Sequence, residues 1–215
     1  MSKDFGEDIF QLDSDLAAIS LLSAKVKVLV VGAGRAGFIK ARSFAAKGCS
    51  VTVLSLDFME EFNRLAVEYG VTLIKDAYFP TFLDKYHLIV IAVKDSNIIH
   101  EIRKDCKSRC KLHLDCSDHK EGNFVVPSQG KTRNINYSIS TKAASPITST
   151  FLMRKIGTSL REYDDTIEYI GRLRKSLKGH ERLKEIMTFV SSDDFNFFFR
   201  KGYGDTIIKM FYKDI

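Results

Sequence analysis

The sequence predicts an α/β protein with a doubly wound parallel sheet, followed by a small hairpin region and a C-terminal helical domain. Three observations predict it. Short apolar runs alternate with amphipathic stretches of helical length between residues 26 and 115. The apolar run 28–31 leads directly into Gly32, Gly34 and Gly37, spaced G-x-G-x-x-G. Beyond residue 118 the pattern changes to hairpin-like alternation and then to helical spacing. The first part is therefore of the Rossmann type.

The elements of the sheet alternate in order along the chain. We expect strands at 26–31, 50–55, 71–75, 86–93 and 111–115. Helices are expected at 35–48, 58–70 and 96–110, and Gly48 and Gly70 close the first two. Strand and helix alternation in these lengths is typical of parallel βαβ units.

Changes of pattern divide the chain into four regions: an N-terminal extension (1–24), a Rossmann domain (25–118), a hairpin region (119–145) and a helical domain (146–215). In the extension, Ile9, Leu12, Leu16, Ile19 and Leu22 have helical spacing and predict a short helix. In the hairpin region, two strand-like runs are expected on either side of a connection at 128–134.

Composition indicates an ordinary globular protein. The chain has 215 residues, of which 45% are apolar and 28% charged. The apolar runs 26–31 and 88–93 are far shorter than the roughly 20 residues that span a bilayer, and the first residues are acidic rather than basic. We therefore expect a cytoplasmic protein without a membrane segment.

Charge and cysteine content exclude several function classes. The net charge is +6, but no dense Lys/Arg block with interleaved aromatic residues is present, so nucleic acid is not expected as a partner. An acidic small molecule remains compatible with the charge. The four cysteines lack the spacing of a disulfide framework or a structural zinc site, so no metal is expected.

The glycine loop has the context that dinucleotide binding requires, with a strand before it and a helix after it. Gly32 allows the tight turn, Gly34 lets the backbone approach a pyrophosphate, and Gly37 allows close packing of helix and strand. Arg35 and Ala36 begin the helix, whose N–H groups face the phosphates. The alternative is a turn that uses glycine only for its geometry.

The other candidate cofactor contacts follow the second and fourth strands. NAD sites usually end the second strand with an acid that binds the ribose hydroxyls, but here Ser55 has that place and Asp57 is the nearest acid. No arginine adjoins Ser55, so these residues alone leave NAD or NADP open. Val93 ends the fourth strand and Asn97 follows it, and Asn97 equally suits the start of a helix.

Four stretches, at 28–55, 87–102, 114–129 and 137–156, occur in an order and spacing that resemble a known family. The chain resembles the precorrin-2 dehydrogenases of siroheme synthesis, which include the dehydrogenase–ferrochelatase domain of siroheme synthase, and is most similar to the dehydrogenase-only members. The resemblance covers about residues 26–160. The family commonly has glycine where this chain has Ala143.

The resemblance implies a specific activity. Such enzymes use NAD to oxidise precorrin-2 to sirohydrochlorin, and some then insert iron. They are homodimers whose hairpin region exchanges contacts between subunits. Their active site lies between the nucleotide domain and the helical domain.

Two residues are candidates for the catalytic acid or base. In chelatase-competent members a single aspartate stands where the chain crosses into the hairpin. An alignment without a gap from Phe124 places Ser117 there, whereas a shift of one residue places Asp118 there. Asp118 is the first candidate base and Ser117 the second, with capping of a turn as the alternative for both. His113 and His119 are nearby candidates for a proton shuttle, or structural residues.

The substrate implied by the resemblance is a polycarboxylate tetrapyrrole, which requires cationic partners. Arg154, Arg174 and Lys178 are the candidates, with Arg174 and Lys178 expected on one helical face. Ser145 is a further candidate contact. The alternatives are a solvated charged face and, for Ser145, a helix cap.

Three functions are therefore compatible with the sequence. The first is an NAD-dependent precorrin-2 dehydrogenase. The second is a bifunctional dehydrogenase and ferrochelatase, for which Asp118 is the motive. The third is a non-catalytic NAD(H)-sensing module, favoured by the missing acid at Ser55.

Overall fold

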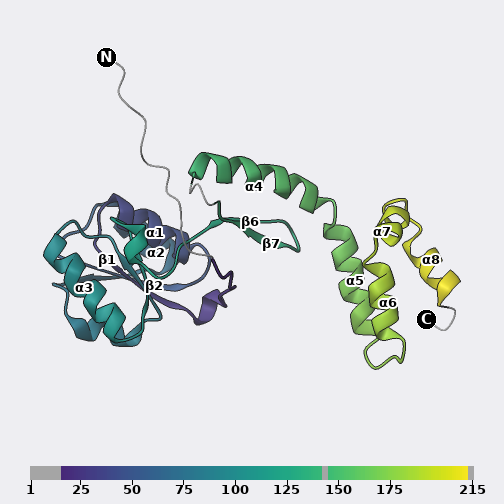
Figure 1. The fold of residues 1–215 in the computed structure, drawn as a ribbon, viewed down its shortest axis with the longest axis horizontal. Coiled ribbons are helices and arrows are strands. Elements are labelled where there is room, and N and C mark those ends of the chain that lie inside the picture. Colours follow the sequence, from purple (N-terminus) through teal and green to yellow (C-terminus); the bar gives the residue numbers. More distant parts are fainter. Residues whose placement is uncertain (1–15, 142–144, 213–215) are drawn as a thin grey trace, which may run out of the picture. The chain divides into compact units, whose positions relative to one another are not determined.

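The computed structural model describes residues 16–141 and 145–212 (Figure 1). The described residues divide into two compact units, one from 16 to 126 and one from 127 to 212. Among the described helices, none is long and apolar enough to cross a membrane.

The first unit is built on a sheet of five parallel strands. These are β1 (Lys27–Val31), β2 (Ser50–Ser55), β3 (Thr72–Lys75), β4 (Leu88–Ile91) and β5 (Leu112–Asp115), in the order β3-β2-β1-β4-β5. In β1, Val28 pairs with Val51 on one side and with Leu88 on the other. The predicted doubly wound fold class is thereby confirmed.

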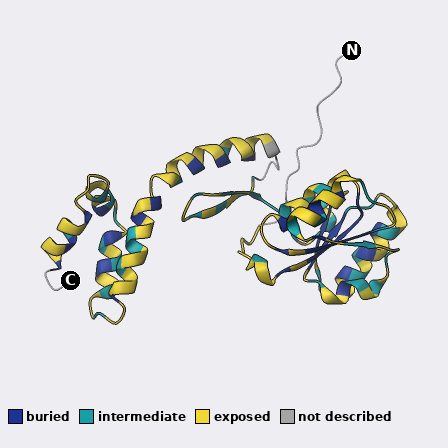
Figure 2. Cartoon of the chain, turned by 180° about the vertical axis from the view of Figure 1, so that it is seen from behind, coloured by how far each residue is buried: buried dark blue, intermediate teal, exposed yellow. Residues whose placement is uncertain are grey.

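Helices cover both faces of this sheet. Helices α1 (Arg35–Ala45) and α2 (Glu61–Tyr69) lie on one face, and α3 (Ser96–Ser108) with the short 3-10 helix η2 (Pro80–Lys85) lies on the other (Figures 1 and 2). On the first face, Val28 and Val30 belong to the core with α1 and α2, whereas on the second face Leu29 and Val31 belong to the core with α3 and η2. Since successive residues of a strand point to opposite faces, burial on both sides explains the continuous apolar run of β1.

The N-terminal extension differs from its prediction over the residues that the structure describes. Residues 16–22 are not helical, and only the 3-10 helix η1 (Ser23–Lys25) precedes β1. Ile19 and Leu22 are exposed by 73% and 71%, so their apolar stripe has no surface in this unit to pack against. The predicted helix is wrong there, and Ile9 and Leu12 lie outside the described residues.

The second unit begins with an antiparallel hairpin of β6 (Ser128–Lys131) and β7 (Asn136–Ile139), against which α4 (Pro146–Arg161) packs. The hairpin itself was predicted, but its first strand falls inside 128–134, which was predicted as a connection. The reason is that Phe124 and Val126 pack against the core of the sheet. The hairpin therefore starts only after Pro127.

Four further helices complete the second unit: α5 (Asp164–Ser176), α6 (Leu183–Val190), α7 (Asp193–Arg200) and α8 (Gly204–Phe211). Their common core contains Ile186, Val190, Phe195 and Ile208. The ring of Tyr169 stacks on that of Phe195 with 5.9 Å between centroids. Part of the aromatic C-terminal sequence thus forms this core.

Asp164 joins the hairpin turn to the start of α5. Its buried carboxylate accepts hydrogen bonds from Thr132 Oγ1 at 2.6 Å and from the backbone N–H groups of Arg133 and Asn134 at 3.1 and 2.9 Å. The hydrogen bond from Thr132 is the largest influence on the pKa of Asp164, and with the backbone bonds it outweighs burial and holds that pKa below its usual range. An ionised carboxylate therefore fixes the turn.

Candidate functional site

Gly32 makes the tight turn that the sequence predicted after β1. Its φ is +108°, in the region that favours glycine, and its N–H donates to the carbonyl oxygen of Leu54 at 2.8 Å. A Cβ at this position would lie 2.5 Å from the carbonyl oxygen of Ala92, which follows β4. Residue 32 has no room for a side chain.

The other two glycines differ from each other in their surroundings. A Cβ at Gly37 would lie 2.0 Å from the carbonyl oxygen of Gly32, so α1 rests directly on the turn. At Gly34, apart from the glycine and its two chain neighbours, no heavy atom of the described chain lies within 4 Å of a Cβ position. Gly34 is the N-cap of α1 and makes no side-chain cap, and Arg35 and Ala36 in the first turn are exposed. The first N–H groups of α1 are thus open to an anion, as a pyrophosphate site requires.

The loop lies where the strand order of the sheet reverses. β1 is flanked by β2 on one side and by β4 on the other, so the chain leaves β1 and β4 at adjacent positions and in opposite directions. In open α/β sheets, ligands bind at this switch point, beyond the carboxyl ends of the strands. Gly32, after β1, and Val93, after β4, are therefore both placed at the same edge.

The remaining candidate cofactor residues follow or end the neighbouring strands at this edge. The last residue of β2 is a serine and supplies no carboxylate. Ser55 ends β2 in register with Lys75 of β3, and Asp57 is exposed two residues later. Asn97 lies in the first turn of α3, where its N–H donates to Asp95 Oδ1 at 2.8 Å. Asp95, which sequence reasoning did not single out, is the N-cap of α3.

Asp115 is the main residue of the edge that sequence reasoning missed. It is the last residue of β5 and is only 2% exposed. Its Oδ2 accepts from Arg103 Nε of α3 at 2.7 Å. Its Oδ1 accepts from Ser117 N at 2.7 Å, Ser117 Oγ at 2.5 Å and Asp118 N at 3.1 Å. A buried, fully hydrogen-bonded carboxylate therefore shapes the turn that carries both catalytic candidates.

Acid should remove the contribution of Asp115 to stability. Burial by itself raises the pKa of this carboxyl group, but the hydrogen bonds from Ser117 and Arg103 lower it below its ordinary 3.8. A depressed pKa stabilises the fold above the unfolded value, and this stabilisation disappears as the pH falls through the native value. We expect the melting temperature to fall more steeply below about pH 4 in the wild type than in Asp115→Asn. Parallel curves for the two proteins would contradict this.

The two catalytic candidates differ in what they bind. Both side chains are exposed, and Ser117 donates its hydroxyl proton to Asp115. Asp118 is the N-cap of the 3-10 helix η3 (His119–Glu121), with Oδ1 accepting from Lys120 N at 3.0 Å. Asp118 thus caps the turn through one oxygen, while its carboxylate faces solvent.

His113 is a structural residue in this arrangement. It is 2% exposed within β5, and its Nδ1 and Nε2 lie 3.3 Å and 3.0 Å from the carbonyl oxygens of Lys111 and Glu121. Its own N–H donates to Asn123 Oδ1 at 2.7 Å. The ring thus contacts the end of η3, and the backbone N–H of the same residue contacts the segment after it.

Comparison with known proteins agrees with this geometry. Residues 19–128 match the NAD_binding_7 family, described as "Putative NAD(P)-binding". The chain belongs to this NAD(P)-binding family. The match ends at the residue that opens β6, so the family covers nearly all of the first unit.

Two siroheme synthases and one solved structure are similar to this NAD(P)-binding family member. The siroheme synthase 2 of Klebsiella pneumoniae is 26% identical over 70% of this chain, and the siroheme synthase of Buchnera aphidicola is 27% identical over 71%. The chain spans about a third of the length of these curated relatives. The structure described as SirC, precorrin-2 dehydrogenase, has a TM-score of 0.65 at 20% identity and covers 85% of this chain and 92% of its own. The fold is therefore shared over both units.

The substrate candidates of this NAD(P)-binding protein lie in the second unit. Arg154 on α4 and Arg174 on α5 are exposed, as is Lys178. Helix α5 ends at Ser176, and Leu177 is its buried C-cap. Lys178 is therefore outside the helix, and the predicted common helical face of Arg174 and Lys178 is wrong.

Ser145 is the N-cap of α4, and its Oγ accepts from Thr148 N at 3.3 Å. We expect Ser145→Ala to lower the free energy of unfolding by about 1 kcal/mol, because one N–H of the first turn loses its partner. Denaturant unfolding measures this change, with Thr158→Ala, further along α4, as the control. An unchanged midpoint for Ser145→Ala would contradict the capping role.

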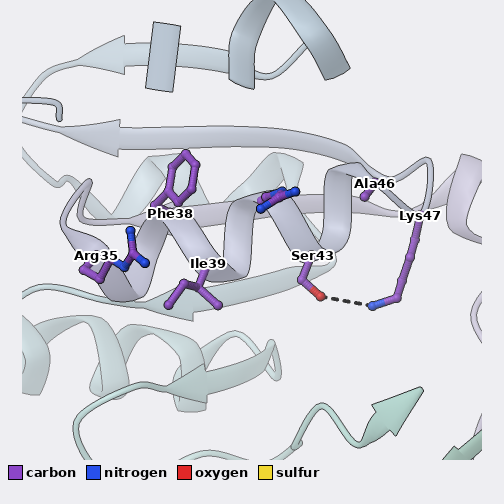
Figure 3. A pocket seen from close by; sticks show the side chains of 7 residues that line it. Arg35, Phe38, Ile39, Ser43, Ala46 and Lys47 are labelled. Atoms are coloured by element: carbon purple, nitrogen blue, oxygen red, sulfur yellow. Dashed lines mark hydrogen bonds between the residues drawn. The ribbon is translucent and has the colours of Figure 1, made fainter. Parts of the chain in front are cut away.

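Cationic side chains also line a pocket along α1 and the two residues that follow it. Figure 3 shows the side chains that line this pocket, among which Lys47 Nζ donates to Ser43 Oγ at 3.0 Å. The pocket is lined by Arg35, Phe38, Ile39, Arg42, Ser43, Ala46 and Lys47. Only Arg35 among these is a predicted site residue.

Among the residues described, no three His, Cys, Asp or Glu side chains are grouped as metal ligands would be.

Proposed function

We propose that this protein catalyses the NAD-dependent oxidation of precorrin-2 to sirohydrochlorin in siroheme biosynthesis, as a cytoplasmic homodimer. The observation that carries the proposal is the N-terminus of α1, which has no side-chain cap, begins at the open Gly34 and lies at the switch point of the sheet. Ser117 and Asp118 follow β5 at the carboxyl edge of the same sheet. The similarity to siroheme synthases and to the fold of a precorrin-2 dehydrogenase supports the choice of reaction.

The residues of the chain fit the cofactor that this reaction needs. Bound NAD supplies a nicotinamide ring that accepts a hydride. The N–H groups at residues 34–36 would hold the pyrophosphate, because glycine at 34 leaves the backbone accessible and α1 directs its positive end there. Ser55, Asp57, Val93 and Asn97 would be the contacts of the two nucleoside parts, since they lie at or just beyond the ends of β2 and β4.

The substrate loses a hydride and a proton in this oxidation. Asp118 is the proposed proton acceptor, since its carboxylate is exposed at the carboxyl edge of the sheet, and it then releases the proton to solvent. Arg154, Arg174, Lys178 and Ser145 are the proposed partners of the substrate carboxylates.

Two structural features support the proposed location and assembly. Cys49, Cys106, Cys110 and Cys116 are free thiols, as is usual in a reducing compartment. The β6–β7 hairpin is a two-stranded sheet with α4 packed against it, and the edges of such a sheet gain stability when they are paired or covered.

One observation favours a second candidate, an NAD(H)-sensing module without catalysis. The last residue of β2 is Ser55, so the usual acidic contact to the ribose is absent from that position. A ferrochelatase activity in addition to the oxidation rests on Asp118, with Fe²⁺ as substrate.

An anaerobic assay separates these functions. Purified protein receives fresh precorrin-2 and NAD, and absorbance follows NADH and sirohydrochlorin together. A stoichiometric rise of both supports the dehydrogenase, whereas NADH binding without turnover supports the sensor. Sirohydrochlorin with Fe²⁺ then tests chelation against the uncatalysed rate.

A further inference from the structure

We infer that Asp115 is a positioning residue of the reaction, which is anchored by Arg103 and itself holds the Ser117–Asp118 turn in place. The inference rests on the proposed function and deepens it. It does not follow from the glycine loop, and Asp115 was not among the residues that the sequence singled out.

The place of Asp115 in the sheet puts it at the carboxyl edge, where ligands bind in open α/β sheets. It ends β5 opposite Ile91 of β4, and the next residue, Cys116, donates its N–H to the carbonyl oxygen of Ile91 at 2.9 Å. The β4 strand leads into Ala92, whose carbonyl lies against Gly32. Asp115 thus starts its turn directly beside the strand that supports the glycine loop.

The hydrogen bonds of Asp115 are divided between the scaffold and the turn. Oδ2 faces the scaffold and accepts from Arg103, which is 21% exposed and also lies 3.8 Å from Glu121 of η3. Oδ1 faces the turn and accepts from two backbone N–H groups and one hydroxyl. A single side chain therefore fixes the backbone of residues 117 and 118.

This arrangement fixes what Ser117 can offer to a ligand. A serine hydroxyl has one proton, and that of Ser117 is donated to Asp115 Oδ1 at 2.5 Å. Toward substrate or cofactor, Ser117 Oγ is left as a hydrogen-bond acceptor. Asp118 has its N–H held by Asp115, while its carboxylate projects into solvent from a backbone that cannot turn freely.

Asp115 itself is a poor proton acceptor. All four of its donors favour the ionised carboxylate, and protonation would disrupt the contact with the Arg103 guanidinium. With 2% exposure it also has no open path to a substrate. Its chemistry is therefore to stay charged and to hold the base at a constant position, which matters because small misplacements of a catalytic group reduce the rate strongly.

The test compares Asp115→Asn and Arg103→Gln with a matched control, Asp76→Asn. Asp76 directly follows β3, the outer strand of the same sheet, and its Oδ1 accepts from the N–H of the next residue at 2.7 Å, but Asp76 is exposed. For each full-length protein, NADH titration counts the folded cofactor sites, and the anaerobic assay gives kcat per such site and KM for NAD.

We expect Asp115→Asn to lower kcat per cofactor site by about tenfold or more, and Arg103→Gln to lower it severalfold. In both variants KM for NAD stays within about twofold of the wild type, and Asp76→Asn behaves as wild type. A merely structural role would reduce the number of cofactor sites and the melting temperature while kcat per site stays unchanged, and that result would overturn the inference. If Asp115→Asn does not fold, Arg103→Gln decides the question alone.

The two proposals fail in different ways. A wild-type protein that binds NADH but does not oxidise precorrin-2 refutes the proposed function, and the positioning role falls with it. An active wild type with an equally active Asp115→Asn and Arg103→Gln refutes only the positioning role.

Discussion

Gly37→Ala is expected to destroy the nucleotide-binding unit rather than to weaken it. The added methyl group would lie 2.0 Å from the carbonyl oxygen of Gly32. The backbone at residues 32 and 37 cannot move apart easily, because the sheet and α1 hold it in place. Overpacking of this kind costs about 3 kcal/mol or more. That is a large part of the roughly 5–15 kcal/mol by which domains are stable. Thermal unfolding and NADH titration would show a lower melting temperature and lost binding.

Gly34→Ala is the matched control for this prediction. The methyl group at residue 34 would lie within 4 Å of no described heavy atom outside residues 33–35, so the unit should melt close to the wild-type temperature. Its affinity for NADH should nevertheless fall, because the methyl group occupies the space through which the pyrophosphate approaches. Equal melting temperatures for Gly37→Ala and wild type would contradict the packing argument. Unchanged NADH affinity in Gly34→Ala would contradict the placement of the cofactor.

Asp118→Asn is expected to lower kcat by about 100-fold or more, the usual contribution of a general base. Ser117→Ala should lower it only severalfold, because the backbone N–H groups of residues 117 and 118 still bind Asp115. The anaerobic assay with precorrin-2 and NAD measures both rates. The reverse order of effects would place the functional residue at Ser117, as the alignment without a gap does.

Stability measurements make this comparison selective. Asparagine caps a helix as well as aspartate does, so Asp118→Asn should keep the hydrogen bond from Lys120 N and the melting temperature of the wild type. NADH affinity should be unchanged in both variants. A loss of turnover that accompanies a loss of NADH binding would indicate a damaged fold and not a missing base.

The sheet and its helices could be predicted from the sequence because local patterns decide them. The three inner strands of the first unit, β2, β1 and β4, are rich in apolar residues and mostly buried, and Gly32 and Gly70 take positive φ values that glycine tolerates. The start of the hairpin could not be predicted in this way. Phe124 and Val126 have the pattern of a strand, but they pack on a core formed by residues far away in the sequence.

The candidate site was only partly predictable for a similar reason. The glycine loop is a local motif with a known geometry. As that geometry requires, a Cβ has no room at Gly32 and Gly37 and has open space at Gly34. Asp115 lies in the segment 114–118, which contains two aspartates, and local sequence does not distinguish the buried one. Its burial and its partner depend on α3, from which Arg103 reaches across to β5. An acidic residue at the end of a buried strand was the available signal, since the carboxyl edge is where ligands bind.

The contact between Asp164 and the hairpin turn limits how parts of related chains can be exchanged. The turn at 132–134 relies on a carboxylate that lies thirty or more residues later, beyond the whole of α4. A chimera joined between α4 and α5 would bring in a foreign residue opposite that turn and leave its backbone donors without their acceptor. A junction after residue 126 keeps the hairpin and the last helices together as one inherited piece.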